Sequence, residues 1–179
     1  MNITLIGMPG SGKSFIGKKL AERLGYALVE LDQIMEGEYG SPLQQILDQL
    51  GEDPFLEKQE MDAIAHTTNK SDLVISPGGS IVYTKGAMEH LKSISTIMYL
   101  KAPLALIEQR IGTEPRGIVR KKEKTLAELY DERTLLYEHW AMDTINADQD
   151  AERVIADILL GASRIPRSFT AGMNGRKVV

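Results

Sequence analysis

The sequence predicts an α/β fold in which a parallel sheet of five strands carries helices on both faces. Short apolar runs typical of strands alternate with longer segments of helical periodicity, and repeated β-α units of this kind build parallel sheets. The runs at 73–76 and 96–100 are almost continuously apolar, as expected for strands covered on both faces. The 179 residues suit one domain, and 42% hydrophobic with 26% charged residues is an ordinary globular composition.

The first half of the chain begins with a short apolar strand at Asn2–Ile6, which runs into a glycine-rich loop. Apolar residues then recur at Ile16, Leu20 and Leu24, which predicts a helix with one buried face that ends at Gly25. The other elements expected in this half are a strand at 27–31, a helix with Ser41 as N-cap, Pro42 in its first turn and Gln44 as reciprocal cap, and a helix from 53 to about 66.

The second half of the chain continues the alternation. Residues 111–124 are rich in glycine, proline and charge, and we expect them to form a short lid. The segment 162–179 has no apolar periodicity and is expected to be a flexible tail, which leaves 1–161 as the single domain. Further expected elements are strands at 73–76, 96–100 and 142–145, and helices at 103–110, at 125–140 behind a Thr125/Glu128 capping box, and at 151–160 before Gly161.

Charge and composition exclude several classes of function. The net charge of −4 gives no reason to expect nucleic-acid binding, and the chain has no cysteine for disulfides or thiolate metal sites. Its three histidines lack metal-ligand spacing, so we expect structural or surface roles for them. There is no signal-peptide pattern, and no apolar run approaches the ~20 residues that span a bilayer. We expect a cytoplasmic protein without a membrane partner, and a monomer.

The segment from Gly7 to Ser14, GMPGSGKS, fits the P-loop pattern G-x-x-x-x-G-K-[ST] at every fixed position and lies between a strand and a helix. Its glycines let backbone N–H groups turn towards phosphate oxygens, and the helix N-terminus adds partial positive charge. We expect Lys13 to reach the β- and γ-phosphates of ATP and the Ser14 hydroxyl to bind Mg²⁺. A glycine-rich turn with a chance lysine is disfavoured, because both the pattern and its context are present.

A P-loop predicts nucleotide binding, and other features narrow the reaction. The chain is small for a motor or transporter ATPase, and we expect it to lack the guanine-reading Asn-Lys-x-Asp pattern of GTPases. The charged segment at 111–124 is placed as the lid of a small-molecule or nucleotide kinase, where it excludes water so that the γ-phosphoryl group reaches the acceptor. We therefore expect a P-loop kinase fold and an ATP-dependent phosphotransferase.

Residues 1–160 resemble shikimate kinase in an ordered set of motifs beyond the P-loop. The set comprises Leu31-Asp32, Gly40-Ser41, Gly51-Glu52 with Phe55, Ser76-Pro77-Gly78-Gly79, and Arg133-Thr134-Leu135-Leu136-Tyr137. P-loops occur in many families, whereas this ordered set is more specific. The resemblance implies ATP-dependent phosphorylation of shikimate to shikimate 3-phosphate, with ATP and Mg²⁺ as cofactors and a part in aromatic amino acid biosynthesis.

On the acceptor side, the resemblance implies that Asp32 holds the acceptor hydroxyls and accepts the proton of the attacking oxygen. Gly78 and Gly79 let backbone N–H groups approach the acceptor, and Arg133 pairs with its carboxylate through the guanidinium fork. Structural alternatives remain open for all of them. Asp32 is also readable as a surface carboxylate, the glycines as an ordinary turn, and Arg133 as the partner of a neighbouring glutamate.

On the nucleotide side, the resemblance implies that Lys13 and Arg116, in the lid, neutralise the transferring phosphoryl group. Arg116 lies in a charged stretch that is also readable as solvated surface. Arg110 flanks the adenine, close to a loop at 146–148. The implied nucleotide-binding set is Gly10, Ser11, Gly12, Lys13, Ser14, Phe15, Arg110, Arg116 and Asp148, and the implied metal ligands are Ser14 and, through water, Glu30.

Three positions depart from the family pattern. Leu56 stands where the family has an arginine that also grips the carboxylate, a contact worth roughly 1.5–3 kcal/mol. Ser80 replaces the third glycine of the turn, and Glu30 replaces an aspartate near the metal. Three hypotheses follow: a shikimate kinase in which Lys58 or another cation replaces the arginine, a related kinase for a different polyol, sugar acid or nucleoside, and a non-catalytic ATP-binding module.

Overall fold

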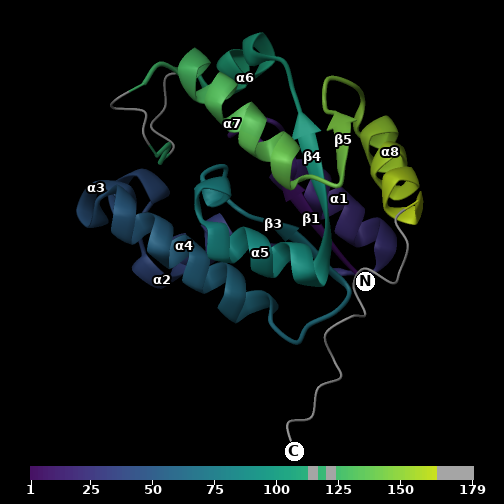
Figure 1. Cartoon of the computed structure of the whole chain (residues 1–179), viewed down its shortest axis with the longest axis horizontal. Helices are drawn as coiled ribbons and strands as arrows, with labels where there is room; N and C mark the ends of the chain where they lie inside the picture. The colour runs from purple at the N-terminus through teal and green to yellow at the C-terminus, as the bar shows by residue number, and fades with distance from the viewer. Residues whose placement is uncertain (113–116, 120–123, 165–179) are drawn as a thin grey trace, which may run out of the picture.

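A computed structural model describes residues 1–112, 117–119 and 124–164. In the described part of the chain, five parallel strands form one sheet in the order β2-β3-β1-β4-β5, as Figure 1 shows. This arrangement confirms the α/β fold expected from the sequence. The strands are β1 (Asn2–Ile6), β2 (Ala27–Glu30), β3 (Leu73–Ser76), β4 (Ser95–Lys101) and β5 (Asp143–Asn146).

Helices lie on both faces of the sheet (Figure 1). The connection from β1 to β2 runs towards one edge, whereas those from β3 to β4 and from β4 to β5 run towards the other. Because crossovers between parallel strands are right-handed, α1 lies on the face opposite α5 and α7. The helices are α1 (Lys13–Leu24), α2 (Leu31–Tyr39), α3 (Leu43–Leu50), α4 (Glu52–Thr67), α5 (Lys85–Ile94), α6 (Leu104–Ile111), α7 (Leu126–Trp140) and α8 (Ala151–Arg164), with a 3-10 turn at Ile81–Tyr83.

The parallel strands β1 and β3 pair with each other, but the connections that leave them run towards opposite edges of the sheet, so the strand order reverses between them. A crevice forms at the carboxyl ends of two such strands, because the helices that follow them lie on opposite faces of the sheet. Ligands of open α/β sheets bind in this crevice. The loop after β1 and the turn after β3 therefore meet at the place where this fold holds its ligands.

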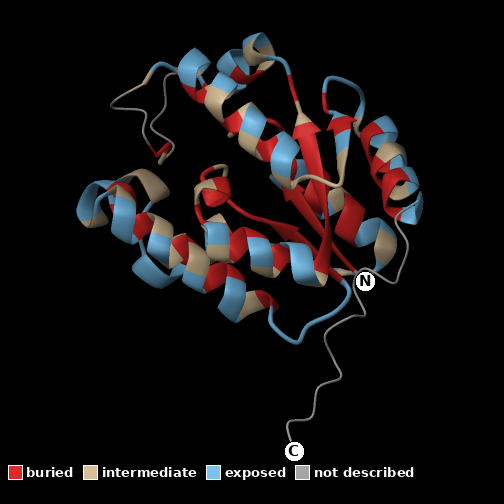
Figure 2. Cartoon of the chain, in the orientation of Figure 1, coloured by how far each residue is buried: buried red, intermediate tan, exposed pale blue. Residues whose placement is uncertain are grey.

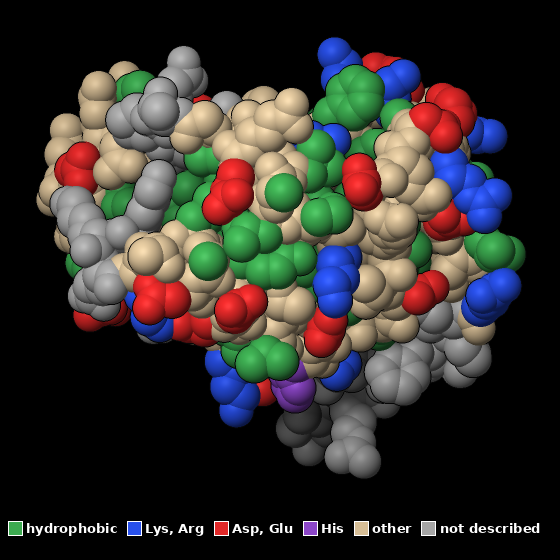
Figure 3. Space-filling model, turned by 90° about the horizontal axis from the view of Figure 1, so that it is seen from above, with side chains coloured by type: hydrophobic (Ala, Val, Ile, Leu, Met, Phe, Trp, Pro, Cys, Tyr) green, Lys and Arg blue, Asp and Glu red, His purple; other side chains and the backbone are tan. Residues whose placement is uncertain are grey.

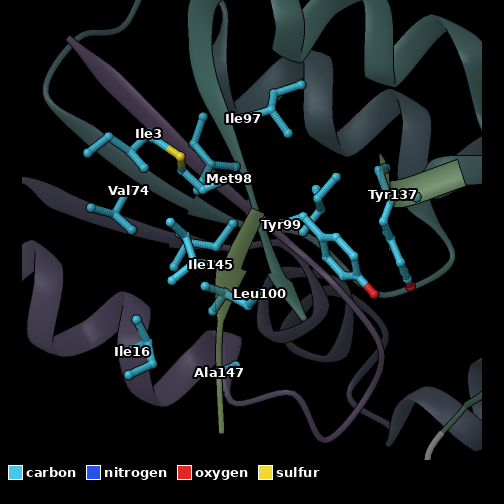
Figure 4. Packing of buried hydrophobic residues seen from close by; sticks show 14 of the residues in the cluster. Ile3, Ile16, Val74, Ile97, Met98, Tyr99, Leu100, Tyr137, Ile145 and Ala147 are labelled. Atoms are coloured by element: carbon cyan, nitrogen blue, oxygen red, sulfur yellow. The ribbon is translucent and has the colours of Figure 1, made fainter. Parts of the chain in front are cut away.

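The main core lies on both faces of the central strands, whose residues are buried along their whole length in β1 and β3 (Figure 2). The strands contribute side chains such as Ile3 and Leu100, and the helices contribute Ile16 and Tyr137. The rings of Tyr99 and Tyr137 stack with centroids 5.0 Å apart (Figure 4). This contact joins α7 to β4 and fixes one wall of the crevice.

A second cluster of buried apolar side chains lies apart from the main core, beneath α2, α3 and α4. Five buried residues form it, and partly buried leucines, including Leu56, pack around them. The five are Met35, Ile46, Leu47, Phe55 and Val119. Because Val119 belongs to the segment 117–119, this second cluster anchors that segment against α3 and α4.

Two expected helix boundaries are wrong. The N-cap of α3 is Pro42, one residue later than expected, and no side chain caps this helix. The Leu43 N–H donates instead to Glu36 Oε1 at 2.9 Å, so a neighbouring helix satisfies it. Gly161 does not end α8, which continues to Arg164. A Cβ on Gly161 would lie 2.6 Å from Asp143 Oδ2, so this glycine permits close packing on β5.

Two helices that the sequence patterns did not indicate are α2 and α5. The expected strand at 27–31 ends one residue earlier, and Leu31 instead begins α2. The expected flexible tail at 162–179 falls within α8 as far as Arg164, and the rest of it lies outside the described residues. None of the helices in the described ranges has the length and apolar character needed to cross a membrane.

Candidate active site

The P-loop connects β1 to α1 with a backbone that only glycine adopts readily. Gly10 and Gly12 have φ angles of 82° and 97°, in the left-handed region. Gly12 is the N-cap of α1, so the first N–H groups of this helix face the loop with no side-chain cap. The hydroxyl of Ser11 is buried and has no hydrogen-bond partner among the described residues. Unsatisfied donors around a bare loop fit a cradle for phosphate oxygens.

Lys13 is buried within the loop. Its Nζ donates to the carbonyl oxygens of Gly7 at 2.8 Å and Met8 at 3.0 Å. Burial lowers the pKa of the Lys13 ammonium to about 8, against the opposing effect of the Asp32 carboxylate. A polyphosphate beside this ammonium would favour its charged form, as it would for any desolvated cation.

A cleft of about 610 Å³ opens between the P-loop, α2, α4, the turn after β3, and α7. It brings together most of the residues that the sequence analysis singled out. Its lining includes Gly10, Gly12, Lys13, Ser14, Phe15, Glu30, Asp32, Gly78, Gly79, Arg110 and Arg133. Ser11 and Asp148 are not among the lining residues, and Arg116 lies outside the described residues.

Asp32 lies in the first turn of α2, where the partial positive charge of the helix end favours a carboxylate. Burial nevertheless raises the pKa of Asp32 to about 6. Lys13 opposes this shift, whereas the carboxylates of Glu36 and Glu30 add to it. Asp32 is therefore a carboxylate inside the cleft with raised basicity, which excludes the alternative of an ordinary surface residue.

The turn after β3 packs closely against Asp32 at one of its glycines and against the P-loop at the other. A Cβ on Gly78 would lie 2.5 Å from Asp32 Oδ1, and a Cβ on Gly79 would lie 2.7 Å from Pro9 Cδ in the P-loop. Tyr137 donates from its hydroxyl to the carbonyl oxygen of Gly79 at 2.6 Å. These contacts need glycine at both positions for steric reasons, so the turn brings backbone against Asp32 and the P-loop.

Arg133, on α7, is 1% exposed. Its Nε donates to the Tyr83 hydroxyl at 3.2 Å, its Nη2 donates to the Val119 carbonyl oxygen at 2.8 Å, and the guanidinium lies over the Tyr83 ring. It does not bridge a helix-surface glutamate, because Glu138 pairs with Lys101 and Arg133 points inward. A buried cation with neutral hydrogen-bond partners in the cleft is suited to bind an anion.

On the nucleotide side, Arg110 at the end of α6 donates from Nη1 to the Gly10 carbonyl oxygen at 3.2 Å. Phe15 is 59% exposed on the first turn of α1, so its ring is available to a ligand. Asp148 is exposed in the turn after β5, where its N–H donates to Asn146 Oδ1 at 2.9 Å. Its contact with adenine stays a prediction.

The segment 117–119 closes over one side of the cleft. The Gly117 N–H donates to Gln44 Oε1 at 3.0 Å, and Ile118 and Val119 are buried. A Cβ on Gly117 would lie 2.8 Å from Leu43 Cβ, so the segment lies directly on α3. Gln44, expected as a helix cap, thus holds this segment instead.

Of the three departures from the family pattern, only Leu56 lies elsewhere than the resemblance implied, because Glu30 and Ser80 both line the cleft. Leu56 does not line the cleft but packs against the second cluster. Lys58 cannot replace the missing arginine, because its ammonium is paired with Glu38 and Asp62. Ser80, in contrast, lines the cleft and donates from Oγ to Gln59 Oε1 at 2.8 Å.

Gln59 is a cleft residue that the sequence analysis did not find. It is 3% exposed on α4, one helical turn after Phe55, which also lines the cleft. The spacing of four residues on one helix face was the available signal, since such residues lie one above the other. The partner, Ser80, comes from a different element and only the fold brings it near.

Two other sequence features lie away from the cleft. Glu38, Asp62 and His66 approach one another closely enough to suggest a metal site, but the Lys58 ammonium is already paired with both carboxylates. The expectation that the guanine-reading pattern of GTPases is lacking is wrong, because residues 69–72, Asn-Lys-Ser-Asp, match it. They lie just before β3, at the amino end of the strands and so at the end of the sheet opposite the P-loop, where Asp72 binds the N-terminal ammonium at 2.9 Å. They are therefore not placed to read a base.

The parallel sheet, the P-loop and the cleft at the carboxyl ends of β1 and β3 define a P-loop phosphotransferase. The sequence model of shikimate kinases matches residues 9–162 of this chain. The chain belongs to the shikimate kinase family, and so to the ATP-dependent kinases with an alcohol acceptor.

Individual relatives agree with this assignment. The chain is 36% identical to the shikimate kinase of Persephonella marina over 139 residues, which covers 76% of this chain and 83% of that protein. It is 38% identical to the shikimate kinase of Clostridium botulinum over 142 residues, which covers 76% of this chain and 82% of that protein. The structure of shikimate kinase from Acinetobacter baumannii in complex with shikimate matches with a TM-score of 0.78 and 31% identity over 89% of this chain and 90% of that one. The structure of shikimate kinase from Aquifex aeolicus matches with a TM-score of 0.76 and 25% identity, over 92% of this chain and 97% of that one.

Proposed function

We propose that the protein transfers the γ-phosphoryl group of ATP to the 3-hydroxyl of shikimate, giving shikimate 3-phosphate and ADP. One observation carries the proposal: Lys13, Asp32 and Arg133 line the same cleft. A phosphate-binding lysine, a basic carboxylate and a buried guanidinium match the three parts of a reaction that joins a triphosphate to a hydroxylated carboxylate. The solved relative from Acinetobacter baumannii binds shikimate, in line with this acceptor.

At the nucleotide end, the P-loop N–H groups and Lys13 hold the β- and γ-phosphates. Arg110 and Phe15, which also line the cleft, flank the base. Ser14 and Glu30 also line the cleft and offer the oxygen ligands that Mg²⁺ prefers, Ser14 directly and Glu30 through water. When bound, Mg²⁺ neutralises charge on the phosphate oxygens. Arg116 is proposed to add a positive charge from the lid.

At the acceptor end, Arg133 pairs with the carboxylate of shikimate, and the backbone at Gly78 and Gly79 approaches the ring. Asp32 orients the reacting hydroxyl. Because the pKa of Asp32 is raised to about 6, its carboxylate is ionised at pH 7.5 yet more basic than an ordinary aspartate.

The reaction is an in-line displacement at the γ-phosphorus. A bond forms from the acceptor oxygen to phosphorus, and the bond from phosphorus to the β,γ-bridging oxygen breaks with its electron pair leaving on ADP. The hydroxyl proton passes to the Asp32 carboxylate. Lys13 stabilises the charge on the transferring group, so most of the catalysis is positioning and electrostatics.

A coupled assay of ADP release tests the proposal. The purified protein is given ATP and Mg²⁺ with shikimate, and in parallel with sugars, polyols, sugar acids and nucleosides. We expect ADP release with shikimate to exceed release with every other acceptor by at least about tenfold. A preference for another acceptor would reject shikimate, and ATP binding without any turnover would support a non-catalytic module.

The second candidate, a kinase for a hydroxylated acceptor without a carboxylate, is favoured by one observation. Leu56 provides no cation, and Lys58 is occupied by Glu38 and Asp62, so Arg133 has no second described cation beside it at the acceptor end. The sugars, polyols and nucleosides of the same assay decide between the two.

The proposal extends to partners. On the face seen in Figure 3, acidic and basic side chains are interspersed and neither sign covers it, which supports a small-molecule acceptor over nucleic acid. The expectations of a monomer, of no membrane partner and of a cytoplasmic location stay predictions. Size-exclusion chromatography with light scattering measures the first of them.

A further inference from the structure

A pair of neutral side chains, Gln59 and Ser80, lies in the acceptor half of the cleft. Gln59 is 3% exposed on α4 and Ser80 is 4% exposed in the turn after β3, and both line the cleft. The Ser80 hydroxyl donates to Gln59 Oε1 at 2.8 Å. Two elements that are distant in the sequence thus meet in one buried hydrogen bond, which fixes the end of the Gln59 side chain.

The amide nitrogen of Gln59 is directed to the reacting part of the cleft. Gln59 Nε2 and Asp32 Oδ1 each lie 2.5 Å from the position that a Cβ on Gly78 would take. The two atoms therefore cannot be further apart than twice that distance, and both lie against the backbone of Gly78.

The orientation of this amide follows from its two neighbours. The Ser80 hydroxyl acts as the donor to Oε1, which leaves the N–H groups on the side of Asp32. The opposite orientation would place the amide oxygen against the Asp32 carboxylate, where both are acceptors and repel each other. No described residue accepts a hydrogen bond from Gln59 Nε2.

We propose that Gln59 is a specificity-determining residue, whose Nε2 donates a hydrogen bond to the acceptor hydroxyl next to the one held by Asp32. Ser80 is the positioning residue that orients the amide. This inference rests on the proposed phosphorylation of a hydroxylated acceptor. For shikimate, the hydroxyl in question is the 4-hydroxyl, which neighbours the reacting 3-hydroxyl.

The charges in the cleft favour a hydroxyl over a carboxylate as the partner of Gln59. The Asp32 carboxylate lies so close to the amide that a second carboxylate bound there would be repelled. Arg133 provides the place for the acceptor carboxylate instead. A neutral amide beside Asp32 thus recognises vicinal hydroxyls, one accepting from Gln59 and the other donating to Asp32. Sites that are built to bond a hydroxyl discriminate against analogues that lack it.

The experiment compares shikimate with 4-deoxyshikimate in the wild-type protein and in Gln59→Met, which keeps the length of the side chain without its amide. The 4-deoxy compound is followed as a substrate or, without turnover, as a competitive inhibitor. We expect Gln59→Met to raise KM for shikimate about tenfold, while the affinity for 4-deoxyshikimate and KM for ATP stay unchanged. The matched control is Gln49→Met, on the exposed side of α3, which should change none of these values.

Ser80→Ala tests the positioning step. We expect a smaller rise in KM for shikimate, about threefold, and a double variant with Gln59→Met no weaker than Gln59→Met alone, because Ser80 acts through Gln59. Equal weakening of shikimate and its 4-deoxy analogue by Gln59→Met, or additive effects in the double variant, would overturn the inference.

The outcome is independent of whether shikimate is the acceptor. If the panel identifies another vicinal diol as substrate, the same measurements are made with that compound and its deoxy form, so failure of shikimate alone rejects only the proposed acceptor. If the protein phosphorylates no hydroxylated compound, both proposals are rejected. Retained thermal unfolding midpoints and ATP affinity in the variants show that the fold and the nucleotide end are intact.

Discussion

Arg133 donates from Nη2 to the carbonyl oxygen of Val119 at 2.8 Å. This bond joins α7 to the segment 117–119, whose Val119 side chain packs in the second cluster with Phe55. The guanidinium that we assign to the acceptor carboxylate is therefore also a contact of the segment that covers the cleft. Binding of the acceptor and placement of this segment share one residue.

Replacement of Arg133 should weaken the acceptor and spare ATP. A charge-assisted hydrogen bond contributes roughly 1.5–3 kcal/mol, so we expect Arg133→Met to raise KM for shikimate by about one to two orders of magnitude. Arg133→Lys keeps the charge without the guanidinium fork, so its KM for shikimate should lie between those of the wild type and of Arg133→Met. Steady-state kinetics measures both, with Arg153→Met on the exposed side of α8 as control. An unchanged KM for shikimate in Arg133→Met would contradict the assignment.

Val119→Ala should loosen the segment that covers the cleft. The change removes two methyl groups from a fully buried side chain and weakens its packing by roughly 1–2 kcal/mol. We expect a severalfold rise in ATP hydrolysis without acceptor, because water gains access to the γ-phosphate. ADP release in the absence of shikimate measures this. Val29→Ala, the same change at the edge strand β2, is the control, and equal hydrolysis in both variants would argue against a covering role.

Loss of the Lys13 ammonium should greatly lower turnover and keep the fold. We expect kcat of Lys13→Ala to fall at least about 100-fold, because one preorganised charge is removed from the transferring group. Burial lowers the pKa of Lys13 to about 8, so at pH 7 the folded protein carries an unfavourable buried charge and the variant should unfold no more easily. Single-turnover kinetics and thermal unfolding measure these effects. Lys18→Ala, exposed on the same helix, is the control, and normal turnover in Lys13→Ala would exclude the P-loop as the catalytic centre.

Asp32→Asn should lower kcat by about 10²–10⁴-fold while ATP affinity is kept. In the wild-type protein, kcat/KM should fall as the pH drops through about 6, where Asp32 becomes protonated. The variant should lack this acidic limb. A profile that stays flat in the wild type, or a limb that persists in Asp32→Asn, would remove Asp32 from the proton transfer.

The same pKa also predicts the sign of an effect on stability. The pKa of Asp32 rises from 3.8 to about 6 on folding, so between these values the folded protein binds more protons than the unfolded chain. The contribution of Asp32 to the free energy of unfolding is therefore fully present below about pH 3.8 and is lost as the pH rises through about 6. Asp32→Asn should therefore stabilise the protein at pH 7.5 and not at pH 4. Urea unfolding at both values measures this, and equal changes would count against a buried ionised carboxylate.

Gly78→Ala should damage the acceptor half by contact alone. The added Cβ would meet Asp32 Oδ1 and Gln59 Nε2 at 2.5 Å, so one of these side chains must move. We expect kcat/KM for shikimate to fall at least about tenfold with KM for ATP unchanged. The matched control is Gly37→Ala on α2, where a Cβ meets nothing within 4 Å and should stabilise the helix by roughly 0.5–1 kcal/mol. Full activity in Gly78→Ala would contradict the predicted steric clash with Asp32 and Gln59.

The parts of the fold predicted well are those with local signals. Continuous apolar runs located the strands, and the Thr125/Glu128 capping box is formed as expected. The helix α2 was missed although Leu31 and Met35 have helical spacing, because the preceding strand was extended by one residue and concealed its start. In α5, Gly86 near the start obscured the pattern of its buried residues.

The candidate site divides in the same way. The P-loop, Asp32 and Arg133 belong to recognisable patterns and meet in the cleft. The pair of Gln59 and Ser80 could not be predicted, because a hydrogen bond between α4 and the turn after β3 exists only once the sheet has formed. Leu56 was expected to matter for acceptor binding because the family has arginine there, but its side chain packs in the second cluster and does not line the cleft.

The separation of the two apolar clusters has a consequence for how such a protein changes over generations. The side chains beneath α2, α3 and α4 share no buried member with those that hold the sheet together. We expect substitutions around Phe55, the member of the second cluster that lines the cleft, to change which acceptor fits while leaving the strands and the P-loop in place. A small protein of this design can therefore change the acceptor that it prefers while it keeps ATP as the phosphate donor.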